Sequence, residues 1–208
     1  MPEPLLLPMA DQPPVERADA ARNRVALLEA ARRLVAEHGA ACVTMEAVAA
    51  AAGVGKGTLF RRYSSREGLM AAVLDHSETE WQAAVISRPP PLGPGADPWA
   101  RLVAFGRSRL ETTLLHADLI RAAGASGSRA AGAYSFAALH VRHLLGELGV
   151  SGDLPLLATA LLAPLEIPIL EQQLEADGFP VERLLTGWED LARRVTRQPA
   201  GAAERGRE

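Results

Sequence analysis

The sequence predicts an all-α protein built from two parts, and three observations carry this prediction. Hydrophobic residues make up 48% of the 208 residues but aromatic residues only 4%, which is typical of helices rich in alanine and leucine. Apolar residues recur at helical spacing, and alternating β-branched runs of the strand type are not found. Proline-rich and glycine-rich stretches separate the helical patterns. We expect a three-helix N-terminal unit joined by a long helix to an all-helical C-terminal unit.

Cysteine content and hydropathy indicate the compartment in which the protein works. Cys42 is the only cysteine, so an intramolecular disulfide is excluded. The sequence shows neither a signal peptide nor a membrane span, since the most apolar run, residues 154–170, is broken by prolines (Pro155, Pro164, Pro168). We therefore expect a cytoplasmic protein with no membrane partner.

Charge is distributed unevenly along the chain. The whole chain carries a net charge of −3, which by itself disfavours nucleic-acid binding. Residues 17–70, however, hold nine basic and five acidic residues and so carry +4, which leaves −7 for the remainder. Positive potential concentrated in one segment is typical of a nucleic-acid-binding unit.

The first helix is predicted to span residues 21–38. Leu27, Ala31, Leu34 and Val35 recur at helical spacing, and Gly39 then ends the helix. The preceding residues 1–19 contain five prolines and no sustained period, which predicts a disordered tail.

Two short helices joined by a tight turn follow. Thr44 is expected to cap a helix over residues 45–52, and Gly53 ends it. A second helix begins near Gly55 or Lys56 and runs to about Arg62, which leaves room for only a tight turn. This spacing is the helix-turn-helix pattern.

The second of these helices is expected to pack with one face only. Helical geometry places Leu59 and Tyr63 on one side and points Gly57, Thr58, Phe60 and Arg61 away from it. An outward glycine costs about 1 kcal/mol relative to alanine, so close approach of a DNA phosphate would explain Gly57. The alternative is that the three glycines of residues 53–57 mark a loop.

A phosphate-binding loop of the nucleotide hydrolases was a rival interpretation of residues 55–57. That motif needs glycine where Ala50 stands, serine or threonine where Gly57 stands, and a preceding β-strand. An alanine-rich helical run precedes instead, so the sequence excludes this motif.

Residues 24–74 resemble the amino-terminal domain of the tetracycline-repressor (TetR/AcrR) family of transcriptional regulators. The resemblance rests on short matching pieces: Leu27-Leu28-Glu29-Ala30-Ala31, Gly39, Thr44, Val48-Ala49, Ala52-Gly53-Val54, Gly57-Thr58-Leu59-Phe60, Tyr63 and Ser65-Arg66-Glu67-Gly68-Leu69. It implies a homodimer that pairs through its last two helices and binds a palindromic operator in double-stranded DNA. It also implies a repressor that a small, largely apolar effector releases from DNA.

The resemblance further implies which residues meet DNA: Thr44, Lys56, Gly57, Thr58, Phe60, Arg61, Arg62 and Arg66. Lys56 is assigned to base edges or a nearby phosphate, and the threonines and arginines of this set mainly to phosphates. Phe60 stands where the family more often has tyrosine, so a hydroxyl contact is lost there. Lys56 is also the only lysine in the chain, which suggests a particular role for a compact ammonium.

The C-terminal unit is predicted from its capping signals. Ser64 or Ser65 caps a helix that runs to about Ile86, residues 88–97 form a loop, and Asp97 with Pro98 starts one long or two broken helices up to Ala123. Further helices are expected over 130–148, from Asp153 with a break at Pro164 and Pro168, and from Pro180 to about Arg197. The expected organisation is a tail (1–19), a DNA-binding unit (20–64), a ligand-binding and dimerisation unit (65–197) and a flexible end (198–208).

A small-molecule pocket is expected between helices of the C-terminal unit. Its candidate lining residues are aromatic or ionisable: Trp99, Phe105, His116, Tyr134, Phe136, His140 and Glu166. Glu166 lies among leucines and isoleucines, so it meets solvent, a salt bridge across a dimer, or a ligand. We predict no metal site and no cofactor, although His140 and His143 share a helix face.

Other classes of function stay open at this point. A transcriptional activator or a helical protein-interaction module would use the same helices. An all-helical enzyme is disfavoured because no nucleophile, base and orienting group occur at usable spacing.

Overall fold

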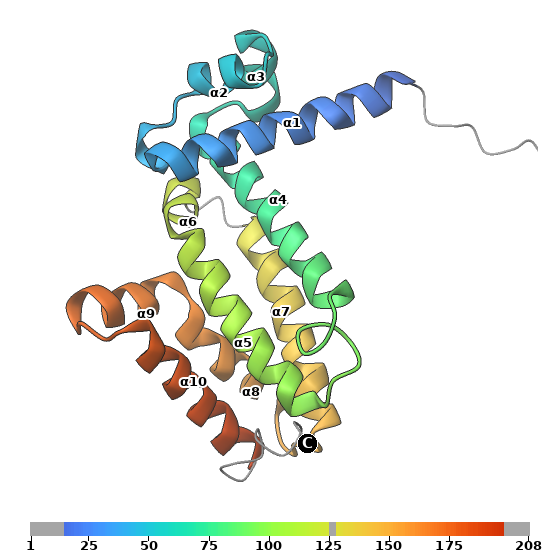
Figure 1. Ribbon diagram of the computed structural model, residues 1–208, viewed down its shortest axis with the longest axis vertical. Coiled ribbons are helices and arrows are strands. Elements are labelled where there is room, and N and C mark those ends of the chain that lie inside the picture. Colours follow the sequence, from blue (N-terminus) through green and yellow to red (C-terminus); the bar gives the residue numbers. More distant parts are fainter. Residues whose placement is uncertain (1–14, 125–127, 198–208) are drawn as a thin grey trace, which may run out of the picture. The chain divides into compact units, whose positions relative to one another are not determined.

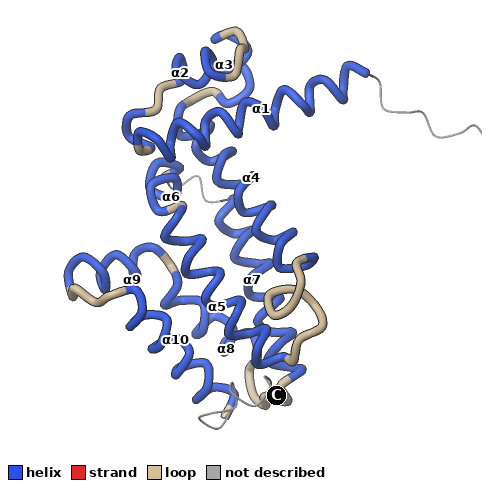
Figure 2. The backbone as a smooth tube through the Cα atoms, viewed as in Figure 1, coloured by secondary structure: helices blue, strands red, loops and turns tan. Residues whose placement is uncertain are grey.

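The computed structural model describes residues 15–124 and 128–197, with side chains for 22–124 and 134–197. In these ranges every regular element is helical and no strand occurs, as the all-α prediction requires (Figures 1 and 2). The chain divides into two compact units, Met1–Ser64 and Ser65–Glu208. Most of the predicted tail, the end over 198–208 and part of the loop over 124–128 lie outside the described residues.

The first unit contains three α-helices and one short 3-10 helix. They are α1 (Val15–His38), η1 (Ala40–Cys42), α2 (Met45–Ala51) and α3 (Lys56–Tyr63). α2 packs against both α1 and α3. Leu27, Leu28 and Ala31 of α1 and Val48 of α2 are almost fully buried, so the apolar stripe predicted for the first helix is the packed face.

The start of α1 differs from the prediction. The helix begins at Val15, six residues before the expected start at residue 21, so the predicted tail over 1–19 extends too far along the chain. Residues 15–24 contain alanine, arginine and glutamate but neither proline nor glycine. Because these residues are good helix formers, α1 begins directly after Pro14, although this segment shows no apolar periodicity.

The second unit contains seven α-helices among the described residues. They are α4 (Arg66–Ser87), α5 (Pro98–Leu115), α6 (Ala117–Ala123), α7 (Ser128–Glu147), α8 (Leu154–Leu162), α9 (Ile167–Glu171) and α10 (Val181–Thr196). A 3-10 turn, η2 (Ala163–Leu165), and a π-helical turn, η3 (Gln172–Ala176), interrupt the α8–α9 segment. Pro164 and Pro168 lie within or just after this break, as predicted.

The capping residues predicted for the second unit hold their helix starts. The Asp97 carboxylate accepts from the backbone N–H of Trp99 and Ala100 at 3.0 and 3.2 Å. Asp153 accepts from the N–H of Leu156 at 3.0 Å. Of the two serines proposed for α4, Ser65 is the cap and accepts from the N–H of Gly68 at 3.1 Å.

The core of the second unit is formed by α4, α5, α7, α8 and α10. α4 packs against α6 and α7, while α5 packs against α7 and α10. Trp188 of α10 lies inside this core and donates from its indole Nε1 to the Leu161 carbonyl at 2.7 Å. This hydrogen bond satisfies the buried indole N–H and fixes α10 against α8.

No single helix of the described ranges is long and apolar enough to cross a membrane. The α8–η2 and α9–η3 segments (Leu154–Leu165 and Ile167–Ala176) reach that length only as a pair, with a bend of 45° between them. Ala158, Leu161, Leu165 and Leu170 of this pair are buried in the core of the second unit.

Candidate nucleic-acid interface and candidate effector site

The turn between α2 and α3 is closed by local hydrogen bonds. Thr44 accepts from the Ala47 N–H at 3.1 Å and so caps α2, as predicted. At the other end, Gly53 has φ +66°, its N–H donates to Ala50 and the Val54 N–H donates to Ala49. This pair of bonds ends a helix with a left-handed residue, which only glycine adopts at little cost. α3 then starts after two residues, because Gly55 is its N-cap.

α3 exposes one face and buries the other. Leu59 is fully buried and Tyr63 is half-buried, whereas Lys56, Gly57, Thr58 and Phe60 are exposed. Arg61 and Arg62 are exposed as well. The predicted orientation of the helix is therefore confirmed, and Gly57 lies inside α3 rather than in a loop.

Lys56 is held by residues of its own unit. Its ammonium forms an ion pair with the Glu46 carboxylate in the first turn of α2 and lies 5.9 Å from the centroid of the Phe60 ring. The hydrogen bond from Lys56 lowers the pKa of Glu46 below its ordinary value. No local sequence pattern indicates this pair, although Glu46 lies only two residues after the capping Thr44.

Arg66 differs from the other DNA candidates because it is the first residue of α4 in the second unit. Ser64, which precedes the Ser65 cap, has φ +62° and closes α3 through its N–H to the Phe60 carbonyl. The arginine therefore directly follows the Ser65 cap of α4.

Three of the seven effector candidates lie in one aromatic cluster of the second unit. The Phe105 and His140 rings stack at 4.9 Å, and Phe136 stacks on His140 at 6.1 Å. Trp81 of α4 completes the cluster, at 5.3 Å from Phe105 and 5.9 Å from Phe136. Trp81 was not among the predicted effector residues. Its contacts with α5 and α7 depend on long-range packing.

His140 is neutral in this cluster. Burial, followed by the positive charges of Arg101 and His143, lowers its pKa to about 4. Its Nε2 is buried and has no hydrogen-bond partner among the described residues. A neutral imidazole with an unsatisfied ring nitrogen offers a polar contact inside an otherwise aromatic environment.

The remaining effector candidates contact other groups. Arg193 lies over the Trp99 ring at 5.5 Å, and the Tyr134 hydroxyl is 2.9 Å from the Thr159 hydroxyl. His116 lies at the break between α5 and α6, which the sequence left as one helix or two. Glu166 is half-buried, and its backbone begins α9. The seven candidates thus do not share one set of contacts.

A buried ion pair adjoins the aromatic cluster. Arg109 of α5 donates from one Nη to both carboxylate oxygens of Glu78 in α4, at 2.9 and 2.8 Å, and each side chain is only 9% exposed. The Arg109 guanidinium also lies 5.1 Å from the centroid of the Trp81 ring. The two residues are 31 positions apart, so no local sequence pattern indicates the pair.

The second unit also has a hollow of about 330 Å³ beside α10. Its lining comes from α5, the break after α8 and α10, and includes Leu110, Pro164, Phe179, Leu184 and Trp188. At the edge of this hollow, the guanidinium carbon of Arg183 lies 3.8 Å from the centroid of the Phe179 ring. None of the seven effector candidates lines this hollow.

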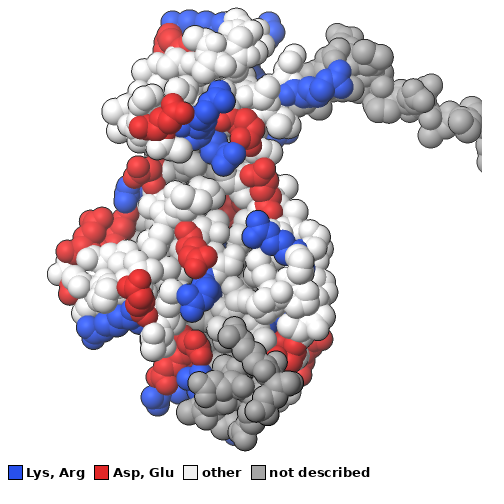
Figure 3. Space-filling model, viewed as in Figure 1, with Lys and Arg blue, Asp and Glu red and all other residues white. Residues whose placement is uncertain are grey.

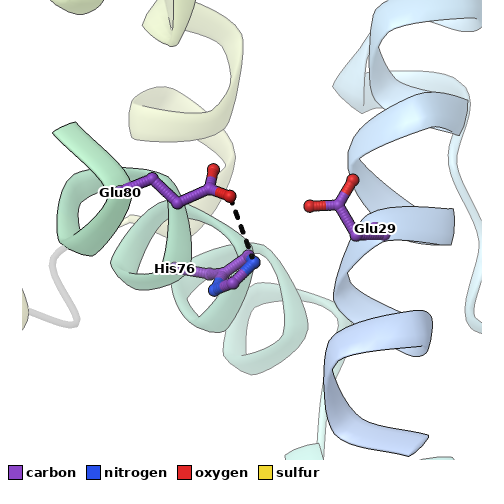
Figure 4. A group of neighbouring side chains, drawn as sticks. All are labelled: Glu29, His76 and Glu80. Carbon is purple, nitrogen blue, oxygen red and sulfur yellow. Dashed lines mark ion pairs between the residues drawn. The ribbon is translucent and has the colours of Figure 1, made fainter. Parts of the chain in front are cut away.

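On the face drawn in Figure 3, the second unit carries acidic and basic side chains interspersed. On α4, the His76 imidazole lies 3.8 Å from the Glu80 carboxylate (Figure 4).

Comparisons with known proteins agree with the helix-turn-helix. A family model described as bacterial regulatory proteins, tetR family, matches residues 27–73. The HTH-type transcriptional repressor LfrR of Mycolicibacterium smegmatis is 37% identical over 82 residues, which are 39% of this chain and 42% of the repressor. The match thus spans less than half the length of that relative.

Solved structures resemble a larger part of the chain. The multidrug binding protein EbrR, complexed with imidazole, is 28% identical with a TM-score of 0.55 over 81% of this chain and 94% of its own. A transcriptional regulator from Rhodococcus sp. Rha1 is 20% identical with a TM-score of 0.61, over 84% of this chain and 96% of its own, which is a likeness of fold.

A helix-turn-helix with an exposed second helix, followed by an all-helical unit, is the arrangement of DNA-binding transcriptional regulators. Residues 27–73 thus match the tetR family of bacterial regulatory proteins, and the similarity to a repressor agrees with that match.

Proposed function

We propose that the protein is a ligand-responsive repressor that binds a palindromic operator as a homodimer and leaves it when a small, largely apolar effector binds. It acts in the cytoplasm, where its DNA partner is found. The effector selects a form of the dimer whose recognition helices no longer fit successive major grooves.

The observation that carries the proposal is the exposed face of α3. Lys56, Thr58, Arg61 and Arg62 are exposed on a helix whose opposite side is held by the buried Leu59. Gly57 on the same face meets no atom within 4 Å of an added Cβ, so its absent side chain leaves room for a DNA backbone. We assign Lys56 to base edges or a phosphate, and Thr44, Thr58, Arg61, Arg62 and Arg66 to phosphates, with Phe60 as an apolar wall.

Exposed apolar side chains support dimerisation through the C-terminal helices. Leu156 of α8 is 63% exposed and Ile169 of α9 is 39% exposed. A second copy of the α8–α9 segment and α10 would remove this surface from water. Two recognition helices related by a two-fold axis then read half-sites about 34–36 Å apart. Leu156→Glu should convert the dimer to monomers in sedimentation velocity, whereas an exposed change outside this surface, Ile86→Glu, should not.

The effector is assigned to the second unit, beside the cluster of Trp81, Phe105, Phe136 and His140. The cluster offers aromatic surface and one neutral, unsatisfied imidazole nitrogen, which suits an apolar molecule with one hydrogen-bonding group. EbrR, a structural relative, is described as a multidrug binding protein, which supports a largely apolar effector here. Whether Trp99, His116, Tyr134 and Glu166 reach the same molecule stays a prediction.

The direct test measures Lys56→Ala on operator DNA recovered from a random-sequence selection, across a range of salt concentrations. Loss of one base or phosphate contact in each protomer should weaken operator binding at least about 10- to 100-fold and reduce the salt slope by about one per protomer. Arg33→Ala removes an exposed positive charge of α1 in the same unit and should have a much smaller effect. Equal behaviour of the two variants would remove Lys56 from the interface.

The selection also separates the proposal from its rivals. A folded protein that enriches no duplex sequence would favour a protein-interaction module instead. A reporter fused to the selected operator distinguishes repression from activation, because deletion of the regulator raises expression only if it represses.

A further inference from the structure

A carboxylate lies among the groups assigned to DNA. Glu46 is in the first turn of α2 and its side chain is 54% exposed, next to the 59% exposed side chain of Lys56. A negative charge at a DNA-binding face opposes phosphate binding, because affinity for DNA depends on the number of phosphates that cations neutralise. Glu46 therefore lowers the affinity of this face for DNA in general.

Stability of the unit gives a weak reason for this carboxylate. Exposed ion pairs contribute little to folding because solvent and salt screen them. The first turn of α2 is already capped by the Thr44 hydroxyl, so Glu46 is not needed to satisfy the Ala47 N–H. A favourable interaction with the helix dipole remains, and it predicts a loss of stability that can be measured separately.

The pair restrains the only lysine of the chain. The ammonium is bonded to Glu46 on one helix and faces the Phe60 ring one turn further along its own helix. The hydrogen bond from Lys56 is also the main cause of the lowered pKa of the Glu46 carboxyl. Two contacts from different sides leave a long, flexible side chain fewer positions than a free lysine has.

We propose that Glu46 is a specificity-determining residue of operator recognition, which lowers non-specific DNA binding by engaging Lys56 until a matching base pair replaces the carboxylate. The inference rests on the proposed DNA-binding function of α3. On non-operator DNA, Lys56 can gain only a phosphate, and it must give up Glu46 while the carboxylate is brought close to phosphates. On the operator, guanine O6 and N7 accept hydrogen bonds from the ammonium in the major groove and compensate for the lost pair.

The test compares the wild-type protein with Glu46→Gln on two duplexes of equal length and composition, one operator and one scrambled, across salt concentrations. The variant should bind the scrambled duplex about three- to tenfold more tightly, with a salt slope steeper by about one per protomer, because Lys56 becomes free to neutralise a phosphate. Operator affinity should change less than about twofold. The ratio of operator to non-operator affinity should therefore fall.

Glu37→Gln is the matched control. Glu37 is an exposed carboxylate of the last turn of α1 and lies 3.7 Å from the His38 imidazole, so the variant makes the same charge change in the same unit. It should leave the affinity ratio unchanged. An equal fall of the ratio in both variants would show that net charge, and not the pair with Lys56, is responsible.

Three other outcomes would overturn the inference. Loss of operator binding by tenfold or more would mean that Glu46 reads a base itself, as a carboxylate does at cytosine N4. Unchanged binding to both duplexes would mean that the pair has no role. A large fall in the urea midpoint of Glu46→Gln would indicate that the carboxylate has a structural role. In that case Glu46→Asp, which keeps the charge but shortens the reach to Lys56, would leave the ratio of operator to non-operator affinity unchanged. Failure of the wild-type protein to bind any duplex would instead contradict the proposed function.

Discussion

Two helical glycines, one in each unit, show how differently the two parts of this protein use the same residue. A Cβ added to Gly57 of α3 would meet no atom within 4 Å. A Cβ added to Gly106 of α5 would lie 2.1 Å from ring carbons of Trp188. Glycine costs stability inside any helix, so each needs a reason. Close packing against Trp188 explains the glycine at 106, whereas no contact within the first unit explains Gly57.

The charged pairs of the two units differ in the same way. Lys56 and Glu46 are both more than half exposed, and solvent screens their attraction. The side chains of Arg109 and Glu78 are each 9% exposed, and each buried charge is neutralised by the other. Substitutions on the exposed face of the first unit should therefore change binding, and substitutions in the second unit should change folding.

The largest expected effect comes from breaking the buried pair. Glu78→Leu leaves the Arg109 guanidinium buried without its carboxylate, which should lower the free energy of unfolding by about 3–5 kcal/mol. Urea unfolding followed by circular dichroism measures it. The exposed counterpart Glu46→Gln should leave the unfolding midpoint nearly unchanged.

A double variant tests the cause of that loss. Replacing both partners by apolar residues of similar size, Glu78→Leu with Arg109→Met, should recover most of the lost stability because no charge is then buried. A double variant no more stable than the single one would show that the pair contributes through its geometry rather than by compensating charge.

The second effect is a pH dependence confined to the second unit. Burial lowers the pKa of His140 from 6.5 to about 4, so the unfolded chain takes up a proton near pH 6.5 and the folded chain only near pH 4. Between these values the unfolded state binds more protons, and stability falls as the pH falls. His140→Leu should reduce the loss of melting temperature between pH 7 and pH 5.

The control is the histidine of the first unit. His38 is at the end of α1 with a side chain 59% exposed, and His38→Gln should keep the pH dependence of the wild-type protein. If both variants lose stability on acidification as the wild-type protein does, titratable groups other than His140 cause the dependence.

The sequence predicted the first unit in detail because its structure is determined locally. The Thr44 cap and the left-handed Gly53 each act within four residues, and the single inward leucine of α3 follows from helical period alone. The prediction failed only at the start of α1, where good helix formers lack an apolar stripe. Glu46 was missed because the side chain that it meets lies on the next helix.

The second unit was predicted only as far as its helix ends. Asp97 and Asp153 act on the backbone within three residues, and both were found. Which aromatic residues meet depends on how α4, α5 and α7 pack, so the stacking of Phe105 on His140 and the position of Trp81 could not be derived from spacing. The seven effector candidates were chosen by residue type, and residue type does not determine contacts across 31 positions such as that of Glu78 with Arg109.

The third effect tests the packed glycine. Gly106→Ala must displace the Trp188 ring, which endangers the hydrogen bond from its indole to Leu161 and should lower the free energy of unfolding by about 1–3 kcal/mol. Gly146→Ala in α7 is the matched change, because its Cβ would meet only a Leu154 methyl at 3.9 Å. It should be neutral or stabilising. Red-shifted or quenched tryptophan fluorescence in Gly106→Ala alone would show that the surroundings of a buried tryptophan are disturbed, as displacement of Trp188 requires.

The smallest effect on folding should be at Gly57, and there it should have the opposite sign. Gly57→Ala adds a methyl group to an exposed helix position with free space, which should raise the free energy of unfolding by about 0.4–1 kcal/mol. The same methyl group points to the face assigned to DNA, so operator affinity should fall while the protein becomes more stable. A more stable variant with unchanged operator affinity would mean that DNA does not approach α3 at this residue, and a less stable variant would mean that Gly57 serves the fold after all. Only the combination of higher stability and weaker binding supports the contrast between the two glycines, because a misfolded first unit would lose both.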